Sequence, residues 1–237
     1  MFFDPLYLLF ALPGMLLAMW AQWRVKSTFS HYSQITTRRG WTGAQIAQAI
    51  LDVHGIRNVR IEPVQGFLSD HYDPTSRTLR LSPDVYQGRS VAAAGVAAHE
   101  VGHAIQHAQG YAFLKMRSSL VPALSLTSKL AMPAIIGGMV LASVGQAALG
   151  QLAMVAGIAL FALMVVFQLV TLPVEFDASN RALRAIESGQ LVTYDERMGA
   201  AKVLNAAALT YVAAAVTAVL QLVYFLYRAG LFGGRRS

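Results

Sequence analysis

Long uncharged stretches dominate the hydropathy pattern of this 237-residue chain and predict membrane-spanning helices. The first, residues 6–23, is long enough to cross a bilayer and ends in two tryptophans. No charge occurs from 130 to 174, which at about 1.5 Å per residue allows two spans with a turn near residues 146–151. A further uncharged run covers residues 203–227. The pattern therefore predicts an α-helical membrane protein with about four transmembrane helices.

The segment between the first span and this hairpin predicts a small α+β unit. Thr42 and Gln45 form a capping-box sequence ahead of an amphipathic helical pattern. Three short strand-like segments follow, at residues 59–64, 66–72 and 78–81. We expect these elements to form one folded unit with the helix that follows them.

A helix predicted over residues 91–109 carries the most informative motif in the chain. Ser90 is a good N-cap, and the stretch is rich in alanine and free of proline. It contains His99-Glu100-Val101-Gly102-His103. Residues four apart share one helix face, so His99 and His103 can bind one metal ion while Glu100 faces a water on it.

That spacing predicts zinc-dependent peptide hydrolysis by a small α+β, zincin-like metalloprotease unit that carries this helix. Neutral imidazoles bind Zn²⁺, and the metal lowers the pKa of its water. Glu100 can then take the proton of that water as the oxygen attacks a peptide carbonyl, which makes it the candidate general base.

A catalytic zinc site usually has three protein ligands, so a third is needed. His107 lies on the same helix but is turned away from the face of His99. A third histidine six residues after the second is excluded, because Gln109 stands there. Glu175, directly after an uncharged span, is the best candidate, and we expect it to open a new helix. Asp177 is the alternative, on another side of that helix.

Composition supports membrane location and limits the chemistry. Hydrophobic residues make up 55% of the chain, and the net charge of +7 comes from 19 Lys plus Arg against 12 Asp plus Glu. The excess of basic residues lies beside the predicted spans and fits contact with anionic lipid, so it gives no case for nucleic acid. The absence of cysteine excludes disulfides and thiol catalysis.

Basic residues also predict the orientation, because short loops rich in them stay in the cytoplasm. Arg24, Lys26, Arg38 and Arg39 follow the first span and place residues 24–129 inside. The basic C-terminal tail would then lie outside after four spans, against the rule. The basic residues that favour the inside outnumber those of the tail. We therefore predict a multi-pass inner-membrane protein whose active site faces the cytoplasm.

Three separated motifs resemble the YugP-like neutral zinc metallopeptidases of bacterial membranes. They are Leu68-Ser-Asp-His-Tyr-Asp-Pro74, Val96-Ala-Ala-His-Glu-Val-Gly-His-Ala-Ile-Gln106 and Thr171-Leu-Pro-Val-Glu-Phe-Asp-Ala-Ser179. More remotely, the chain is similar to the gluzincin membrane proteases of the HtpX and CAAX-prenyl type, whose third ligand is the glutamate of Glu-x-x-Ala-Asp. The resemblance implies that Glu175 is this ligand.

The same resemblance implies that Ala178 lets its helix approach the zinc helix closely. It breaks at Ser179, where the remote relatives have an aspartate that orients a ligand histidine. Either Ser179 or Asp177 can support His99 or His103 here.

A polar cluster precedes the third predicted strand and contains Asp70, His71, Tyr72 and Asp73. It is interpreted either as a hydrogen-bonded turn or as part of an edge strand along which an extended substrate binds. Candidates for a second oxyanion donor are His71, Tyr72 and Tyr194.

These predictions divide the chain into five parts. They are a transmembrane helix (1–23), a membrane-anchored catalytic unit (24–129), a transmembrane hairpin (130–174), a helix with the third ligand (175–202), and a last span with a basic tail (203–237). The expected function is cleavage of a peptide or membrane-protein substrate. The rivals are a non-hydrolytic scaffold pinned by zinc and a protease that cuts within the bilayer.

Overall fold

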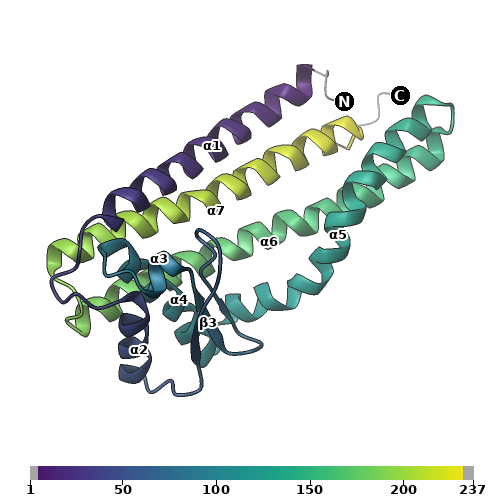
Figure 1. Ribbon diagram of the computed structural model, residues 1–237. Helices are drawn as coiled ribbons and strands as arrows, with labels where there is room; N and C mark the ends of the chain where they lie inside the picture. The colour runs from purple at the N-terminus through teal and green to yellow at the C-terminus, as the bar shows by residue number, and fades with distance from the viewer. Residues whose placement is uncertain (1–4, 232–237) are drawn as a thin grey trace. The chain divides into compact units, whose positions relative to one another are not determined.

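The computed structural model describes residues 5–231, except the side chains of Leu126 and Ser128. This range is mostly helical with one small sheet, as predicted (Figure 1). The elements, in chain order, are α1 (Pro5–Ser33), α2 (Gly43–Val53), β1 (Arg60–Pro63), β2 (His71–Asp73), β3 (Thr78–Leu81), α3 (Pro83–Tyr86), α4 (Val91–Ala108), α5 (Ala112–Ser143), α6 (Ala147–Ser188) and α7 (Tyr194–Arg228).

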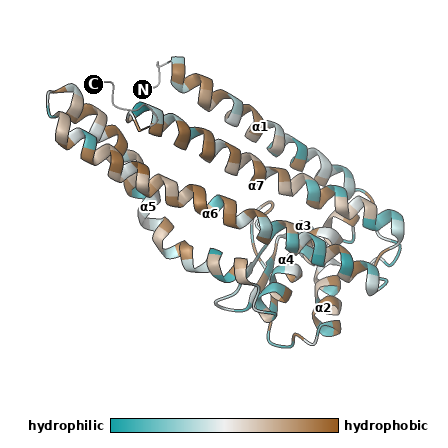
Figure 2. Ribbon diagram, turned by 180° about the vertical axis from the view of Figure 1, so that it is seen from behind, coloured by the Kyte–Doolittle hydropathy of each residue, from teal (hydrophilic) through white to brown (hydrophobic). Residues whose placement is uncertain are grey.

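Three of the described helices are long and apolar enough to cross a membrane, namely α1, α6 and α7. A fourth candidate is α5, whose two halves meet at 51°. Pro122 and Pro133 lie inside α5, one in each half, and each removes one helical hydrogen bond and crowds the carbonyl four residues before it. Apolar residues predominate along all four helices in Figure 2. The prediction of about four spans thus holds when the bent α5 is included.

The hairpin of α5 and α6 differs from the prediction at both of its ends. Its turn lies at residues 144–146, slightly earlier than expected. Glu175 does not open a new helix, because α6 runs unbroken through Pro173 to Ser188. Pro173 removes only one hydrogen bond, to the carbonyl of Leu169, and the residues beyond it keep theirs.

The chain forms two compact units. One contains residues up to 19, 116–171 and those from 211 on. Within it α5 and α6 approach closely, since a Cβ added to Gly138 would lie 2.6 Å from the Gly150 carbonyl oxygen. Its buried cluster includes Ile135, Phe161 and Tyr224. Packing through small residues is typical of helices in a membrane, where backbones can approach one another.

The other unit contains residues 20–115 and 172–210 and is built around α4 (Figure 1). Helices α2 and α3 and strands β2 and β3 all contact α4. Fourteen of the 18 residues of α4 are buried, so this helix forms the centre of the core. Its neighbours contribute buried side chains that include Ile50, Leu79, Val85 and Ile186. The motif helix is therefore held rigidly on several sides.

The sheet has the order β1-β3-β2, with β1 parallel and β2 antiparallel to the central β3. The strand predicted at residues 66–72 is largely absent, because only His71–Asp73 pairs with β3. Gly66 and Leu68 have φ values of +115° and +53°, which no β-strand accommodates. The residues before His71 form a loop, and β2 is a short strand at the edge of the sheet.

Local capping agrees with the sequence. Thr42 and Gln45 form the predicted capping box at the start of α2. Ser90 Oγ accepts a hydrogen bond from the Ala93 N–H at the start of α4. Gly110 follows the end of this helix with a φ of +67°, the left-handed conformation that glycine adopts easily.

Candidate metal centre

The two histidines of the motif lie on one face of α4, as their spacing requires. Their ring centroids are 4.8 Å apart and the ring planes are nearly perpendicular. Both side chains are mostly buried, with exposed fractions of 13% for His99 and 10% for His103. The packing around α4 leaves few other orientations for these rings.

Glu175 reaches the two histidines from α6. Its Oε2 atom lies 3.2 Å from His99 Nε2 and 3.6 Å from His103 Nε2. The Glu175 side chain is only 2% exposed. Glu175 lies 72 and 76 residues after the two histidines in the chain, yet α4 and α6 bring its carboxylate and both imidazoles together.

This donor set fits a zinc ion. One ligand atom from each of the three side chains lies within 4.8 Å of the other two. Tetrahedral zinc with ligands at about 2.0–2.1 Å separates any two of them by about 3.3 Å. The distances from Glu175 Oε2 to the two Nε2 atoms match that spacing. Two imidazoles and one carboxylate are also a common ligand set of catalytic zinc, which keeps its fourth position open.

The second nitrogen of each imidazole faces a neutral acceptor. His99 Nδ1 lies 3.1 Å from Ser179 Oγ, and His103 Nδ1 lies 3.0 Å from Gln106 Oε1. With Nε2 directed at the third ligand, Nδ1 carries the hydrogen and donates in both pairs. Ser179 thus contacts His99, one of the two possibilities left open by the sequence.

Glu100 is buried beside the histidines, with 8% of the residue exposed. Burial raises the pKa of its carboxyl, and the neighbouring His99 and His103 oppose that shift. The carboxylates of Glu175 and Asp70 act in the same direction as burial. A carboxylate with a raised pKa holds a proton more readily, which suits a group that must accept one.

Asp177 is directed to a different set of partners. Its Oδ2 atom accepts hydrogen bonds from Gln106 Nε2 at 2.8 Å and from Arg181 Nε. The guanidinium of Arg181 also donates to Gln109 Oε1 and lies over the ring of Tyr111. Asp177 therefore supports His103 through Gln106 rather than directly.

The polar cluster at residues 70–73 is held by its own contacts. Asp70 accepts hydrogen bonds from the Ser82 N–H and hydroxyl, at 2.7 and 3.0 Å. Burial raises the pKa of Asp70, although these bonds from Ser82 oppose the shift. Tyr72 Oη lies 2.9 Å from His107 Nδ1. The hydrogen bonds of Asp70 agree with the interpretation of a hydrogen-bonded turn. The position of β2 at the edge of the sheet agrees with the interpretation of an edge strand.

The remaining residues that the sequence analysis considered, His71, Tyr194 and His107, are not part of the triad. His71 is exposed, and its Nδ1 contacts the Ser69 carbonyl at 2.8 Å. Tyr194 begins α7 and is 70% exposed. His107 is turned toward Tyr72 and is not part of the triad.

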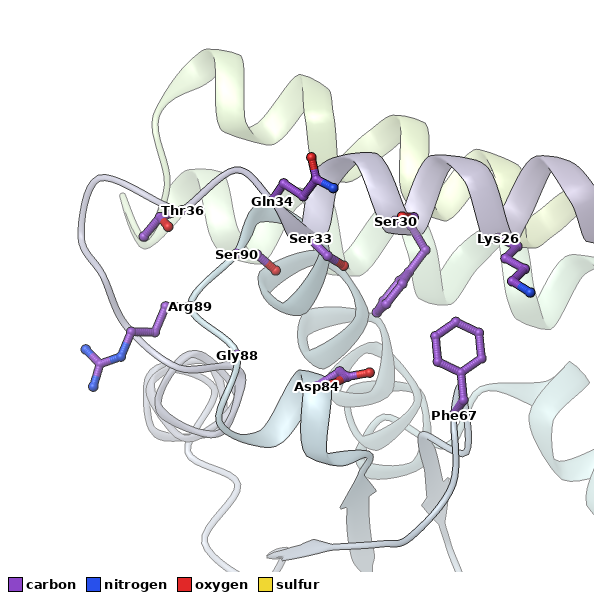
Figure 3. A pocket seen from close by; sticks show the side chains of 11 residues that line it. Lys26, Ser30, Ser33, Gln34, Thr36, Phe67, Asp84, Gly88, Arg89 and Ser90 are labelled. Carbon is purple, nitrogen blue, oxygen red and sulfur yellow. The ribbon is translucent and has the colours of Figure 1, made fainter.

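A separate pocket of about 510 Å³ lies at the N-terminal end of α4 (Figure 3). Phe29 and Phe67 meet edge to face across it, with ring centroids 5.6 Å apart. Ser33, Asp84 and Ser90 add polar groups to its wall. Among the described residues that line it, none belongs to the triad, so this pocket and the metal centre are different places.

Sequence reasoning gave no role to Gln106, which appeared only as the last residue of the second family-like motif. The side chain is completely buried and contacts both α4 and α6 residues. A signal was present, because a polar residue stands three positions after His103, one helical turn from a predicted ligand, on an alanine-rich helix. Its partners on α6, however, could not be identified before the two helices were placed together.

Comparisons with known proteins agree with the geometry. Residues 7–230 match the family described as "Putative neutral zinc metallopeptidase". The chain is also 46% identical over 221 residues to "Putative membrane protease YugP" of Bacillus subtilis (strain 168), which covers 93% of this chain and 95% of that protein. No solved structure matches the chain. The resemblance predicted from three motifs is confirmed.

Proposed function

The chain belongs to the neutral zinc metallopeptidase family, and from this membership we propose that it is a membrane-bound, HExxH gluzincin-type endopeptidase. In this proposal His99, His103 and Glu175 bind zinc, and Glu100 is the general base. The substrate is a peptide or a segment of a membrane protein.

Zinc bound by these residues would supply a more acidic water and polarise the scissile carbonyl. Glu100 accepts the proton that is released as the water oxygen forms a bond to the carbonyl carbon. The same carboxyl then gives this proton to the amide nitrogen as the carbon–nitrogen bond breaks. One water is consumed, and Glu100 returns to its starting state.

The placement of Glu100 carries this proposal. It follows the first ligand directly and is buried beside a triad whose donor atoms already have the spacing of a zinc site. A zinc ion that only stabilises a fold needs no further buried carboxylate beside its ligands. Burying a carboxylate costs free energy, so its presence here favours a role in proton transfer.

The edge strand β2 offers a place for an extended substrate. Its residues His71–Asp73 pair on one side with β3 and form an edge of the sheet. An extended peptide can add to such an edge through backbone hydrogen bonds. Asp70, next to β2, lies close enough to Glu100 for its carboxylate to raise the pKa of Glu100. This proximity to the general base supports placing the substrate along this edge.

The proposal includes the predicted organisation of the chain. Residues 24–129 form a zincin-like catalytic unit, and residues 175–202 supply the third ligand. The spans 1–23, 130–174 and 203–237 anchor the enzyme in the inner membrane, with the active site toward the cytoplasm. The basic residues after the first span support this orientation.

The test compares purified wild-type protein with Glu100→Gln. The amide cannot take a proton, so hydrolysis of a reporter peptide should fall by about two to four orders of magnitude. Zinc content should stay at the wild-type level, because Glu100 is not a ligand. Glu62→Gln is the matched control, because it makes the same change in strand β1 at a residue outside the triad. This variant should keep its activity.

Near-normal hydrolysis by Glu100→Gln would contradict the mechanism. A wild-type protein that binds zinc but cleaves neither peptides nor membrane-protein segments would instead support the scaffold. Mass spectrometry of the products would also show whether cleavage falls within a peptide chain, as an endopeptidase requires.

A further inference from the structure

We propose that Gln106 is a positioning residue of the metal centre, which fixes the ring of His103 and fastens it to the backbone beside Glu175. This inference rests on the proposed ligand set. Gln106 is 0% exposed, although a glutamine is rarely buried without partners. Its three hydrogen bonds account for this burial.

The contacts of Gln106 fix the orientation of its amide group. Its Nε2 atom lies 2.8 Å from the Val174 carbonyl oxygen and 2.8 Å from Asp177 Oδ2. Both neighbours are acceptors, so the two amide hydrogens are directed at them. A flipped amide would place its oxygen against two other oxygens. Therefore Oε1 faces His103.

This orientation determines which nitrogen of His103 carries the hydrogen. Gln106 Oε1 can only accept, so His103 Nδ1, 3.0 Å away, must donate. Nε2 is then left with its lone pair, on the side where Glu175 lies 3.6 Å away. Gln106 thereby holds His103 in the tautomer and ring orientation that metal binding requires.

The amide NH2 group of Gln106 connects α4 and α6, the two helices that supply the ligands. Val174 directly precedes Glu175 in α6, so the bond from Gln106 Nε2 sets the distance between His103 and the Glu175 backbone. Asp177 holds the same amide one helical turn away and is itself held by Arg181. One buried side chain therefore places two of the three ligands.

The test measures zinc affinity, by competition with a chelator, for wild type, Gln106→Met and Gln109→Met. Methionine has a similar length but accepts no hydrogen bond from His103. Loss of such a partner typically weakens metal binding about 10- to 100-fold, and we expect this for Gln106→Met. Gln109→Met is the control, since Gln109 contacts Arg181 on the same helix pair but not a ligand. It should stay within about twofold of wild type.

Two further measurements separate positioning from a loss of packing. The visible spectrum of cobalt-substituted protein reports ligand geometry, and it should change for Gln106→Met only. The double variant Gln106→Glu with Asp177→Asn restores an acceptor for His103 and a donor at residue 177, but residue 106 no longer donates to the Val174 carbonyl. We therefore expect it to recover only part of the zinc affinity that Gln106→Glu alone loses, and to shift the cobalt spectrum toward that of wild type.

Wild-type zinc affinity and an unchanged cobalt spectrum in Gln106→Met would overturn the inference. An equal loss in Gln109→Met would do the same, because it would indicate general loosening of the helix pair. If Gln106→Met does not fold, failure of the double variant to bind zinc more tightly than Gln106→Glu alone would overturn it. His103→Ala serves as a separate reference, since full zinc content there would contradict the proposed ligands themselves.

Discussion

Gly102 of α4 lies directly against the backbone of Ala178 in α6. A Cβ atom added to Gly102 would be only 2.4 Å from the Ala178 carbonyl oxygen, which is closer than atoms can approach. Ala178 is fully buried. The close approach implied at Ala178 by the family resemblance is therefore present, and it occurs one residue before His103 and three residues after Glu175.

Gly102→Ala should push α6 away from α4 and weaken the metal centre. Backbone atoms cannot move aside as a flexible side chain can, so we expect a loss of about 1–3 kcal/mol in stability together with reduced zinc content. Thermal unfolding and metal analysis of the purified variant check this. Gly137→Ala is the control, because a Cβ there meets nothing within 4 Å. Full stability and zinc content in Gly102→Ala would contradict the observed packing.

Glu175→Ala should lower zinc occupancy about as much as His103→Ala. Asp177→Ala should lower it less, because Asp177 faces Gln106 and Arg181 rather than the two imidazoles. Metal analysis of the three variants decides between the carboxylates. Full zinc content in Glu175→Ala combined with loss in Asp177→Ala would transfer the ligand role to Asp177.

Features fixed by near neighbours in the chain were predictable from sequence. The caps at Thr42 and Ser90 depend on residues three positions away, and both are present. The face shared by His99 and His103 follows from the helical repeat alone. Glu175 was selected because catalytic zinc needs a third ligand, and the structure brings it to the two histidines.

Features that depend on long-range packing were not predictable. Glu175 was expected to open a new helix, but α6 continues through this region to Ser188. The strand expected before His71 is a loop, because Asp70 bonds to Ser82 instead of continuing a ladder. Gln106 was missed because its partners on α6 lie about 70 residues away in the chain. For the loop before His71 and for Gln106, contacts with residues distant in the chain determined the structure.

Tyr72→Phe should cost about 0.5–1.5 kcal/mol of stability, the usual value of one hydrogen bond, since its hydroxyl bonds to His107. The rate of hydrolysis should stay near that of wild type, because the hydroxyl is engaged away from the triad. Combining it with His107→Leu, which removes the other partner of the hydrogen bond, in a double-mutant cycle should show a coupling energy, which confirms the pair. A fall in kcat of two orders of magnitude would instead identify Tyr72 as the oxyanion donor.

The two ends of the α5–α6 hairpin should lie on the same side of the membrane. His103 precedes this hairpin and Glu175 lies near the end of its second helix, yet both contribute to one triad. They can meet only if both emerge on the same side of the membrane, and the basic residues after the first span predict the cytoplasmic side.

The chain has no cysteine, so single cysteines can be placed at exposed positions without background labelling. Thr75→Cys and Ser188→Cys should resist an impermeant thiol reagent in intact cells and react in inverted vesicles. Gln146→Cys, in the turn between the two helices, should show the opposite pattern. Labelling of both Thr75→Cys and Ser188→Cys from outside would reverse the orientation and leave the hairpin intact. Labelling of only one of them would rule out the hairpin, and with it Glu175 as a ligand.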